Sequence, residues 1–527
     1  MQNILTYIFL FPLAIALIML LIPANRGKIF QRLSFAAVGI QFILSLLLLG
    51  WFNTDTTPQS WGEVFQFVEK DDWINMSFGS VGTFSVQYFI GVDGISLPLV
   101  ALSSFVLLIG VVSSWNIQKK VKGYFVLYLI LSSSIVGCFI ALDFFLFYLC
   151  FEFMLLPMFF LIGIWGGKRR SYASIKFFLY TLLGSLFILV VMIGLYLSVL
   201  DGVSNTFSLV AMLQGSYAPG SFFDPLSDGT VMGYPARTVA FIFLLIGFGI
   251  KLPMVPVHTW LPDAHVEAPT PISVVLAGLL LKVGAYGLFR ILYGIFPDVA
   301  VNYASLVAGL GVLSILYGGM NALAQRDLKR MVAYSSVSHM GFVLVGLASL
   351  TNEGLLGSMF HMISHGLISP ALFLIVGVLY DRTGDRLMDN FSGIASKMPV
   401  YTFFVALFFF AGLGLPGLSG FVGELLVLIG AFSSSSIGMA YAFLAVIGII
   451  ISAAYFLWTI QRVFFGSYFV RHEEWKENML DLTAREKFML IPLAMLVVLL
   501  GVFPRLVLDY SAETIAFFMD HLSGFAQ

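Results

Sequence analysis

The chain has 527 residues, of which 59% are hydrophobic and 10% are charged, and its mean hydropathy is +0.97. Soluble domains carry about 25% charged residues, so the composition excludes a soluble protein and predicts an integral membrane protein. The net charge of −1 gives no sign of a nucleic-acid partner, and the two cysteines, Cys138 and Cys150, lie in apolar runs without a C-x-x-C spacing. We therefore expect no iron–sulfur cluster and no cysteine-rich zinc site held by this chain alone.

Apolar runs near the roughly 20 residues that a membrane-spanning helix needs recur along the whole chain. They predict an all-α membrane protein with about 14 transmembrane helices. The first run lacks a preceding basic segment and a small-residue cleavage site, so we interpret it as a retained helix and not a signal peptide. The predicted spans are residues 3–23, 32–52, 87–114, 122–140, 142–164, 174–200, 236–260, 270–296, 302–323, 330–350, 355–380, 399–432, 438–465 and 487–509.

Basic residues concentrate in alternate loops, which sets the orientation because cytoplasmic loops are enriched in Lys and Arg. The opposite face holds little beyond Lys70, Arg237, Arg290 and Arg505. We therefore expect both termini on the non-cytoplasmic side. The basic loops carry Arg26, Lys28, Arg32, Lys119, Lys120, Lys122, Lys168, Arg169, Arg170, Arg326, Lys329, Arg330, Arg382, Arg386, Lys397, Arg462, Arg471, Lys476, Arg485 and Lys487.

The string G-x-x-L-P occurs at residues 249–253 and at 412–416, each time inside an apolar run. Five helices separate the two positions, and a five-helix unit repeated in tandem enters the membrane from the opposite side the second time. We predict inverted repeats, spans four to eight and nine to thirteen, with broken helices seven and twelve; chance recurrence of the string is the alternative. The predicted segments are 1–121 (three N-terminal helices), 122–297 (first repeat), 298–466 (second, inverted repeat) and 467–527 (C-terminal loop and last helix).

Four ionisable residues fall inside predicted spans: Glu152, Lys251, Lys282 and Glu424. A charge at a helix centre costs about 2.5 to 3.5 kcal/mol on insertion scales, so such residues usually face a bundle interior and mark a pathway. A static ion pair or a snorkelling side chain is the alternative for any one of them. Together they favour a proton relay, because burial and a movable counter-charge change the proton affinity of lysine and glutamate.

Five of the seven histidines lie in or beside spans: His258, His265, His339, His361 and His365. Each taken alone is explained by an interhelical hydrogen bond. The i, i+4 spacing of His361 and His365 also suggests a metal or a haem ligand pair, but no carboxylate, third ligand or attachment motif accompanies them in the sequence, so we expect no metal. As links between titratable groups the histidines fit a proton path.

Pro253 and Pro256 interrupt the seventh predicted span directly after Lys251. Proline frees backbone carbonyls of the preceding turn, and at membrane depth such groups are tolerated only inside protein or beside water. We therefore predict that this break lets water reach Lys251.

Three long motifs carry a family resemblance: KLPMVPVHTWLPDAHVEAPTPISVVLAGLLLKVGAYGLFR, RDLKRMVAYSSVSHMGF and HGLISPALFL. From IGVDGISLPLV to the helix of Glu424 the chain resembles the antiporter-like subunits of respiratory complex I, the proton-pumping NADH:quinone oxidoreductase. FEFMLLPMFFLIGIWGG, a glutamate at 424 and the lack of a long lateral helix after the last span make it most similar to the M type, which corresponds to mitochondrial chain 4.

The resemblance implies roles for these residues. Glu152 and Lys251 correspond to the family's interacting pair, Lys282 to its central lysine, and Glu424 to its exit residue. His339 and His365 match its connecting histidines, and His258 and His361 are further candidate links.

The resemblance also implies a multi-pass membrane-arm subunit in a bacterial inner membrane, an organellar inner membrane being the alternative. Its partners would be two sister antiporter-like subunits, L and N, and small membrane subunits. NADH, FMN, iron–sulfur clusters and quinone would bind in partner subunits, because this chain shows no dinucleotide fingerprint and no cluster ligands. A D-type subunit of a multisubunit cation/proton antiporter, a membrane-bound hydrogenase subunit and a purely architectural subunit are the alternatives.

Overall fold

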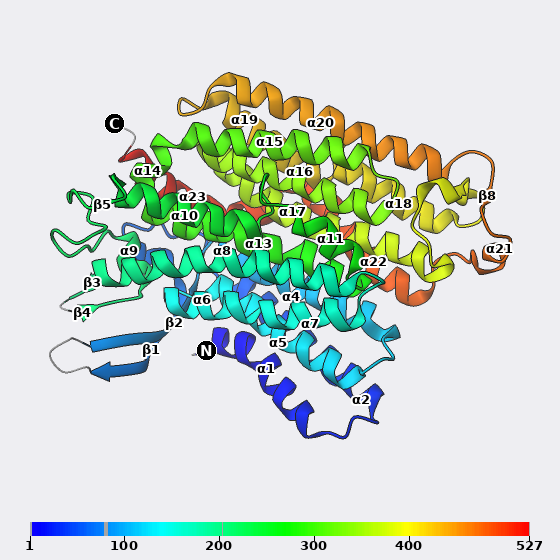
Figure 1. Cartoon of the computed structure of the whole chain (residues 1–527), viewed down its shortest axis with the longest axis horizontal. Helices are drawn as coiled ribbons and strands as arrows, with labels where there is room; N and C mark the ends of the chain where they lie inside the picture. Colours follow the sequence, from blue (N-terminus) through cyan, green and yellow to red (C-terminus); the bar gives the residue numbers. More distant parts are fainter. Residues whose placement is uncertain (1–2, 78–82, 203, 526–527) are drawn as a thin grey trace.

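The computed structural model describes residues 3–77, 83–202 and 204–525, and these residues are mostly helical (Figure 1). Among them, 11 helices are long and apolar enough to cross a membrane, or 12 if α22 (Ala484–Val502) and α23 (Arg505–Ser523), bent by 62°, form one broken span. The 11 are α1 (Ile4–Leu21), α2 (Gly27–Trp51), α4 with η2 (Ser96–Asn116), α5 (Val121–Ile140), α6 with α7 (Phe144–Trp165), α8 (Arg170–Ser198), α12 through η4 (Thr270–Tyr293), α15 (Ala304–Leu323), α16 (Leu328–Ala348), α17 (Asn352–Thr383) and α20 with η7 (Met439–Phe464).

The other expected spans are interrupted helices. Expected span seven is α10 (Ala236–Lys251), followed by turns and then α11 (Trp260–Glu267). Expected span twelve consists of α18 (Pro399–Gly412) and α19 (Ser419–Ser433). Both interruptions lie at the G-x-x-L-P strings. The total of about 14 spans and the inverted relation of the two repeats stay predictions.

The prediction of a mostly helical membrane protein is confirmed, and the described residues also include strands that the sequence did not predict. The largest pair, β1 (Gln66–Ser77) and β2 (Thr83–Val92), forms an antiparallel hairpin. Residues 87–92, expected as the start of a span, belong to β2, where Phe89 accepts a hydrogen bond from Leu142 N (2.9 Å). The two-residue pairs are β3 (Leu200–Asp201) with β4 (Ser204–Asn205), β5 (Thr230–Val231) with β6 (Tyr234–Pro235), and β7 (Phe391–Ser392) with β8 (Phe469–Val470).

Short helices fill the connections, namely α3 (Trp61–Val64), α9 (Leu209–Leu213), α14 (Pro297–Asn302) and α21 (Trp475–Asn478). The helix that crosses the centre is composite: α12 (Thr270–Val275), the π-helix η3 (Leu276–Leu280), α13 (Leu281–Gly287) and a second π-helix, η4 (Leu288–Tyr293). Single π-turns inside α-helices often mark functional sites.

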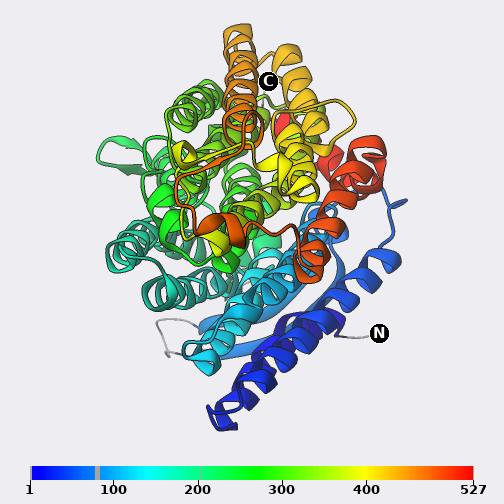
Figure 2. The ribbon, with the colours of Figure 1, turned by 90° about the vertical axis from the view of Figure 1, so that its right-hand side faces the viewer.

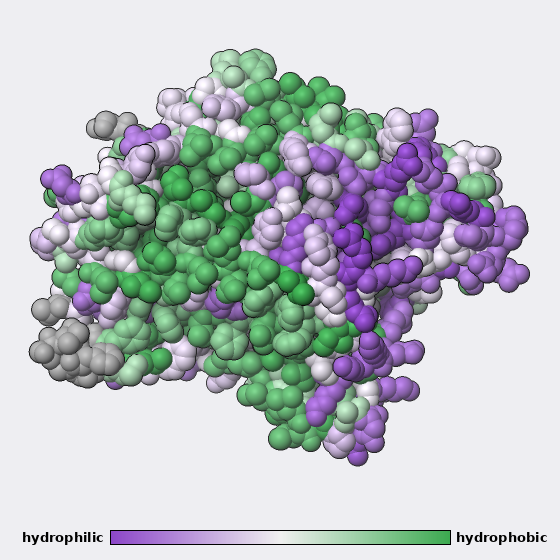
Figure 3. Space-filling model, in the orientation of Figure 1, coloured by the Kyte–Doolittle hydropathy of each residue, from purple (hydrophilic) through white to green (hydrophobic). Residues whose placement is uncertain are grey.

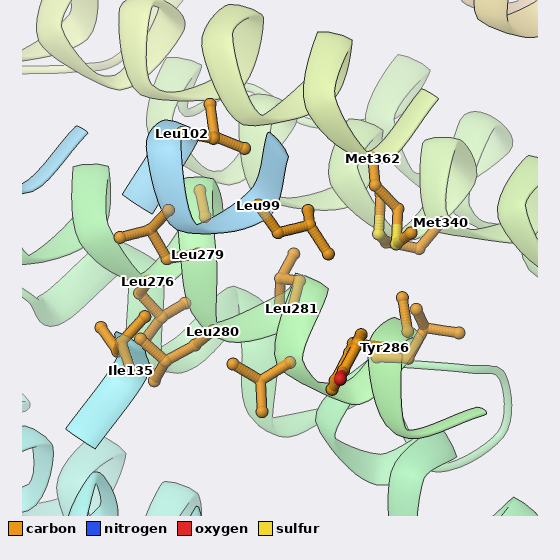
Figure 4. Packing of buried hydrophobic residues seen from close by; sticks show 14 of the residues in the cluster. Leu99, Leu102, Ile135, Leu276, Leu279, Leu280, Leu281, Tyr286, Met340 and Met362 are labelled. Atoms are coloured by element: carbon orange, nitrogen blue, oxygen red, sulfur yellow. The ribbon is translucent and has the colours of Figure 1, made fainter. Parts of the chain in front are cut away.

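The helices differ in how deeply they lie in the bundle, which Figure 2 shows in an end view. The most apolar windows of the composite helix and of α17 are 100% buried, and that of α16 is 94% buried, whereas the windows of α1, α2, α8 and α20 are 33 to 39% buried. Figure 4 shows Leu276, Leu279 and Leu280 of η3 packed beside Ile135 of α5 and Leu99 of α4. The composite helix, α16 and α17 therefore form the interior.

Hydrophobic and hydrophilic residues lie on separate parts of the surface. In Figure 3 a broad hydrophobic area covers the middle of the molecule, and hydrophilic residues gather at the end that carries β8 and α21 in Figure 1. The C-terminus and the start of α1 lie toward the other end, near β5 and the β1–β2 hairpin (Figure 1). The side of the membrane on which each end lies stays a prediction.

Candidate functional site

Lys282 lies in the bundle interior at the start of α13, with no exposed surface. Its Nζ donates to the carbonyl of Ala277, five residues earlier, at 2.7 Å, a carbonyl that belongs to the π-helix η3. The same Nζ lies 2.6 Å from Nδ1 of His365 on α17. The structure thus joins two of the predicted site residues directly.

Three more predicted residues continue from this contact. His339 on α16 has ring-to-ring distances of 5.6 Å to His365 and 5.5 Å to His361. Its Nδ1 lies 3.5 Å from Oε1 of Glu424 on α19. Lys282, His365, His339 and Glu424 therefore form a continuous polar chain across the composite helix, α17, α16 and α19.

A small cavity of about 10 Å³ lies against this chain, lined by His339, His361 and His365 together with Ser335 and Ser364. That volume is close to what one water molecule needs. His365 Nε2 has no hydrogen-bond partner among the described residues, and a water in this cavity would be placed to bridge His365 and His339.

Glu424 is placed by the break between α18 and α19. Gly414 has a φ of +80°, a conformation that suits glycine, and a Cβ added there would lie 2.5 Å from Glu424 Oε2. Leu415, Pro416 and Gly417 are exposed. The carboxylate is itself 2% exposed and lies directly beneath the turn that leads to the surface.

Lys251 is buried at the C-terminal end of α10, and the Glu152 carboxylate lies within electrostatic range of it. Its Nζ has no hydrogen-bond partner and lies 4.7 Å from the ring centre of Phe151 and 5.9 Å from that of Phe177. Glu152, on α6 (Phe144–Phe153) beside Phe151, is half-buried, and among the described residues it forms no ion pair within 4.0 Å. Aromatic faces therefore hold the lysine in this conformation.

In the break after Lys251, two backbone groups form hydrogen bonds with protein side chains. Trp260 Nε1 donates to the carbonyl of Ile250 at 2.8 Å, and Val255 N donates to Ser314 Oγ of α15 at 3.0 Å. The carbonyl of Ile250 is therefore satisfied inside the protein by Trp260, and the access of water to Lys251 stays a prediction.

The histidines near this break lie apart from the chain. His258 is buried with its ring 5.1 Å from that of Tyr317, and its Nδ1 has no partner. His265 is fully buried, stacks on Phe373 at 4.4 Å, and has no hydrogen-bond partner at either ring nitrogen. His265, which the sequence placed among the histidines of a proton path without a family role, lies within electrostatic range of Lys329 and Lys282.

Sequence reasoning also missed the burial of two cations. Arg290, counted among the basic residues of the outer face, is 1% exposed and forms an ion pair with Asp93, which is 0% exposed. Lys329, counted in a loop, is 5% exposed and lines a cavity of about 710 Å³ on the basic face. The motif GVDGISL, which places Asp93 before a span, was the available signal for the first pair.

Asp143 lies outside the spans and anchors α6, the helix that carries Glu152. Its carboxylate accepts from Leu146 N at 3.0 Å, which caps the helix, and from Gln87 N of β2 at 3.2 Å. Burial raises the pKa of Asp143 to about 6. The hairpin and α6 therefore share one carboxylate.

Comparisons with known proteins identify the family of this chain. The profile of a family described as NADH:quinone oxidoreductase/Mrp antiporter membrane subunits matches residues 141–452, more than half of the chain. The chain belongs to this family. A family member from Rhodobacter capsulatus, NADH-quinone oxidoreductase subunit M, is 41% identical over 525 residues, which cover 98% of this chain and 96% of that protein.

Solved structures of the family show the same fold. A chain of respiratory complex I from Thermus thermophilus with bound NADH has a TM-score of 0.79 and 29% identity, covering 98% of this chain and 99% of that chain. A chain of the Mrp complex from Dietzia sp. DQ12-45-1b also has a TM-score of 0.79 but 21% identity, covering 100% and 99%, so that likeness concerns the fold alone.

Proposed function

We propose that this chain is the proton-translocating M-type subunit in the membrane arm of an NADH:quinone oxidoreductase. It moves protons while electrons pass from NADH to quinone in partner subunits. The observation that carries the proposal is the contact between Lys282 and His365, continued through His339 to Glu424. The full-length relationship to subunit M at 41% identity supports the same conclusion.

The relay begins at Lys282, whose Nζ passes a proton to Nδ1 of His365 along the 2.6 Å contact. A water in the adjacent cavity carries the proton to His339, and His339 passes it to Glu424. Glu424 releases it through the break beneath Gly414. Each charge moved outward opposes about 2.3 kcal/mol per 100 mV of membrane potential, so partner subunits must supply the energy.

Lys251 and Glu152 act as the control pair of the relay. In the described conformation the amine of Lys251 lies against two aromatic rings, and Glu152 is half-buried within electrostatic range of it. A carboxylate that approaches a buried lysine favours its protonated form, and its retreat favours proton loss. A change in the Glu152–Lys251 distance therefore raises or lowers the tendency of Lys251 to give a proton to the relay. His258 and His361 are side links in this scheme.

The proposal includes the surroundings of the chain. Its partners are the sister subunits L and N and small membrane subunits, and the NADH, FMN, iron–sulfur and quinone sites lie in partner subunits. The chain resides in a bacterial inner membrane with the basic loops in the cytoplasm and both termini outside. Its segments are residues 1–121, the repeats 122–297 and 298–466, and 467–527.

Purification of the intact complex through a tag on this chain tests the assignment. We expect a complex that oxidises NADH, reduces quinone and shows iron–sulfur signals in electron paramagnetic resonance. Recovery of this chain in an assembly that exchanges cations for protons, without NADH oxidation or iron–sulfur signals, would contradict it and favour the antiporter alternative, which the description of the matching family also names.

A further inference from the structure

Three side chains near the outer end of the relay meet in a way that the sequence does not reveal. His339, His361 and Glu424 come from α16, α17 and α19, and one nitrogen or oxygen atom of each lies within 4.8 Å of the other two. All three residues are buried, with exposed fractions of 7%, 2% and 2%. The expectation that no carboxylate accompanies the histidines is therefore wrong in space, because the break before α19 turns Glu424 toward them.

Three polar atoms of this cluster lack a hydrogen-bond partner in the part of the chain that the structure describes. Both ring nitrogens of His361 and Oε1 of Glu424 have no hydrogen bond among the described residues. Buried polar groups are nearly always paired, so each orphaned atom needs a physical explanation. A proton path through His365, His339 and Glu424 uses His339 and Glu424 but gives no partner to His361.

The donor set suits a transition metal. Two imidazoles and one carboxylate bind Zn²⁺ with bonds of about 2.0 to 2.2 Å, and a water commonly completes the tetrahedron. Ligand atoms of such a site lie about 3.4 Å apart, so side-chain rotations of about 1 Å would close the observed arrangement. The adjacent cavity, which His339 and His361 both line, provides room for the water. Lys282 is directed at His365 Nδ1 rather than at this cluster.

We propose that His339, His361 and Glu424 form an inhibitory binding site for Zn²⁺ or a similar divalent transition metal. The inhibition rests on the proposed function: bound metal would occupy His339 and Glu424, which hold the last two positions of the relay, and would prevent proton release. The metal reaches the site through the break, where Gly414 lies over Glu424 and the next three residues are exposed.

Metal content of the purified whole complex tests the site independently of activity. We expect the His361→Gln complex to bind one Zn²⁺ fewer than the native complex, with His472→Gln, a change at an exposed loop histidine, as the matched control. Co²⁺ should give tetrahedral visible absorption in the native complex that is lost in His361→Gln. Equal Zn²⁺ content and equal Co²⁺ spectra would overturn the proposal.

A second variant covers a failure of His361→Gln to assemble. Glu424→Gln keeps the size of the side chain but replaces the carboxylate, so we expect the same loss of one Zn²⁺; unchanged content would overturn the site. The Zn²⁺ concentration that halves proton pumping, measured against each variant's own metal-free rate, should rise about tenfold or more in His361→Gln.

The site and the relay fail in different ways. Loss of one Zn²⁺ in these variants without any change in Zn²⁺ inhibition would contradict the inhibitory role but would still support the metal site. Unchanged Zn²⁺ content, with pumping that still depends on Lys282, would contradict the metal site but would still support the relay.

Discussion

The contact between Lys282 and His365 limits how many protons the two side chains carry. Two unit charges 2.6 Å apart repel by about 6 kcal/mol even at an effective dielectric constant of about 20. The pair therefore holds at most one positive charge, which either nitrogen can carry. A buried amine and imidazole that share a proton are suited to proton transfer. As a static hydrogen bond, the same contact would contribute little to stability.

His365 and His361 lie one turn apart on α17 but differ in their contacts. His365 meets Lys282 at 2.6 Å, whereas neither ring nitrogen of His361 has a partner. We expect His365→Ala to reduce NADH-driven proton pumping by about tenfold or more and His361→Ala to have a smaller effect. The check is the rate of vesicle acidification in sealed inverted membranes. Equal losses would contradict the path drawn through His365.

The interrupted helices set the geometry at the scale of elements. The break between α18 and α19 brings a carboxylate to the end of the histidine chain and keeps it within one turn of an exposed loop. The break after α10 ends that helix at Lys251. If the helices were continuous at these places, Lys251 and Glu424 would have no path to the protein surface. The proposed relay therefore depends on the two breaks.

Two glycines in the second break provide a matched test. Gly414 and Gly417 both have positive φ, +80° and +90°, so alanine strains the backbone at either position. Only at Gly414 would the new methyl group meet Glu424, 2.5 Å from Oε2; at Gly417 nothing lies within 4 Å. We expect Gly414→Ala to reduce pumping clearly more than Gly417→Ala in complexes of equal abundance. A similar loss in both would show that strain alone matters.

The ion pair of Asp93 and Arg290 ties the turn before α4 to η4 inside the bundle. Asp93→Asn leaves a buried guanidinium without its counter-charge, a change that costs about 3 to 5 kcal/mol of stability. Asp389→Asn, which breaks the exposed pair with Arg462, should cost less than about 1 kcal/mol. Thermal loss of this chain from the purified complex measures both. No difference between the two variants would refute a structural role for the buried pair.

At the scale of the whole molecule, hydrophilic residues gather at the end that carries β8 and α21 (Figures 1 and 3). The orientation is testable with Lys168→Cys and Asp228→Cys, both at exposed positions, because the native cysteines are buried. A membrane-impermeant maleimide should label Lys168→Cys only from the cytoplasmic side and Asp228→Cys only from the outside. The reverse pattern would contradict the proposed orientation.

Sequence alone predicted the parts of the molecule that local chemistry determines. Apolar length placed the long helices, and G-x-x-L-P with its prolines placed both breaks. The sequence could not predict that Lys251 faces Phe151 and Phe177 while Glu152 forms no ion pair, because side-chain direction depends on tertiary packing. Nor could it predict the meeting of His361 with Glu424, which lie on different helices, or the burial of Arg290, whose place near a helix end resembled a loop. The strand β2 was missed because its apolar residues run into those of α4.

The measurement that tests the central claim most directly is NADH-driven proton pumping by complexes with Lys282→Ala, beside Lys476→Ala, which changes an exposed loop lysine. Assembly is checked by NADH oxidation with an artificial electron acceptor. The relay predicts that Lys282→Ala lowers pumping about tenfold or more while the complex stays assembled, and that Lys476→Ala pumps normally. Pumping by Lys282→Ala at the native rate and proton-to-electron ratio would contradict the relay and indicate that this chain has an architectural role.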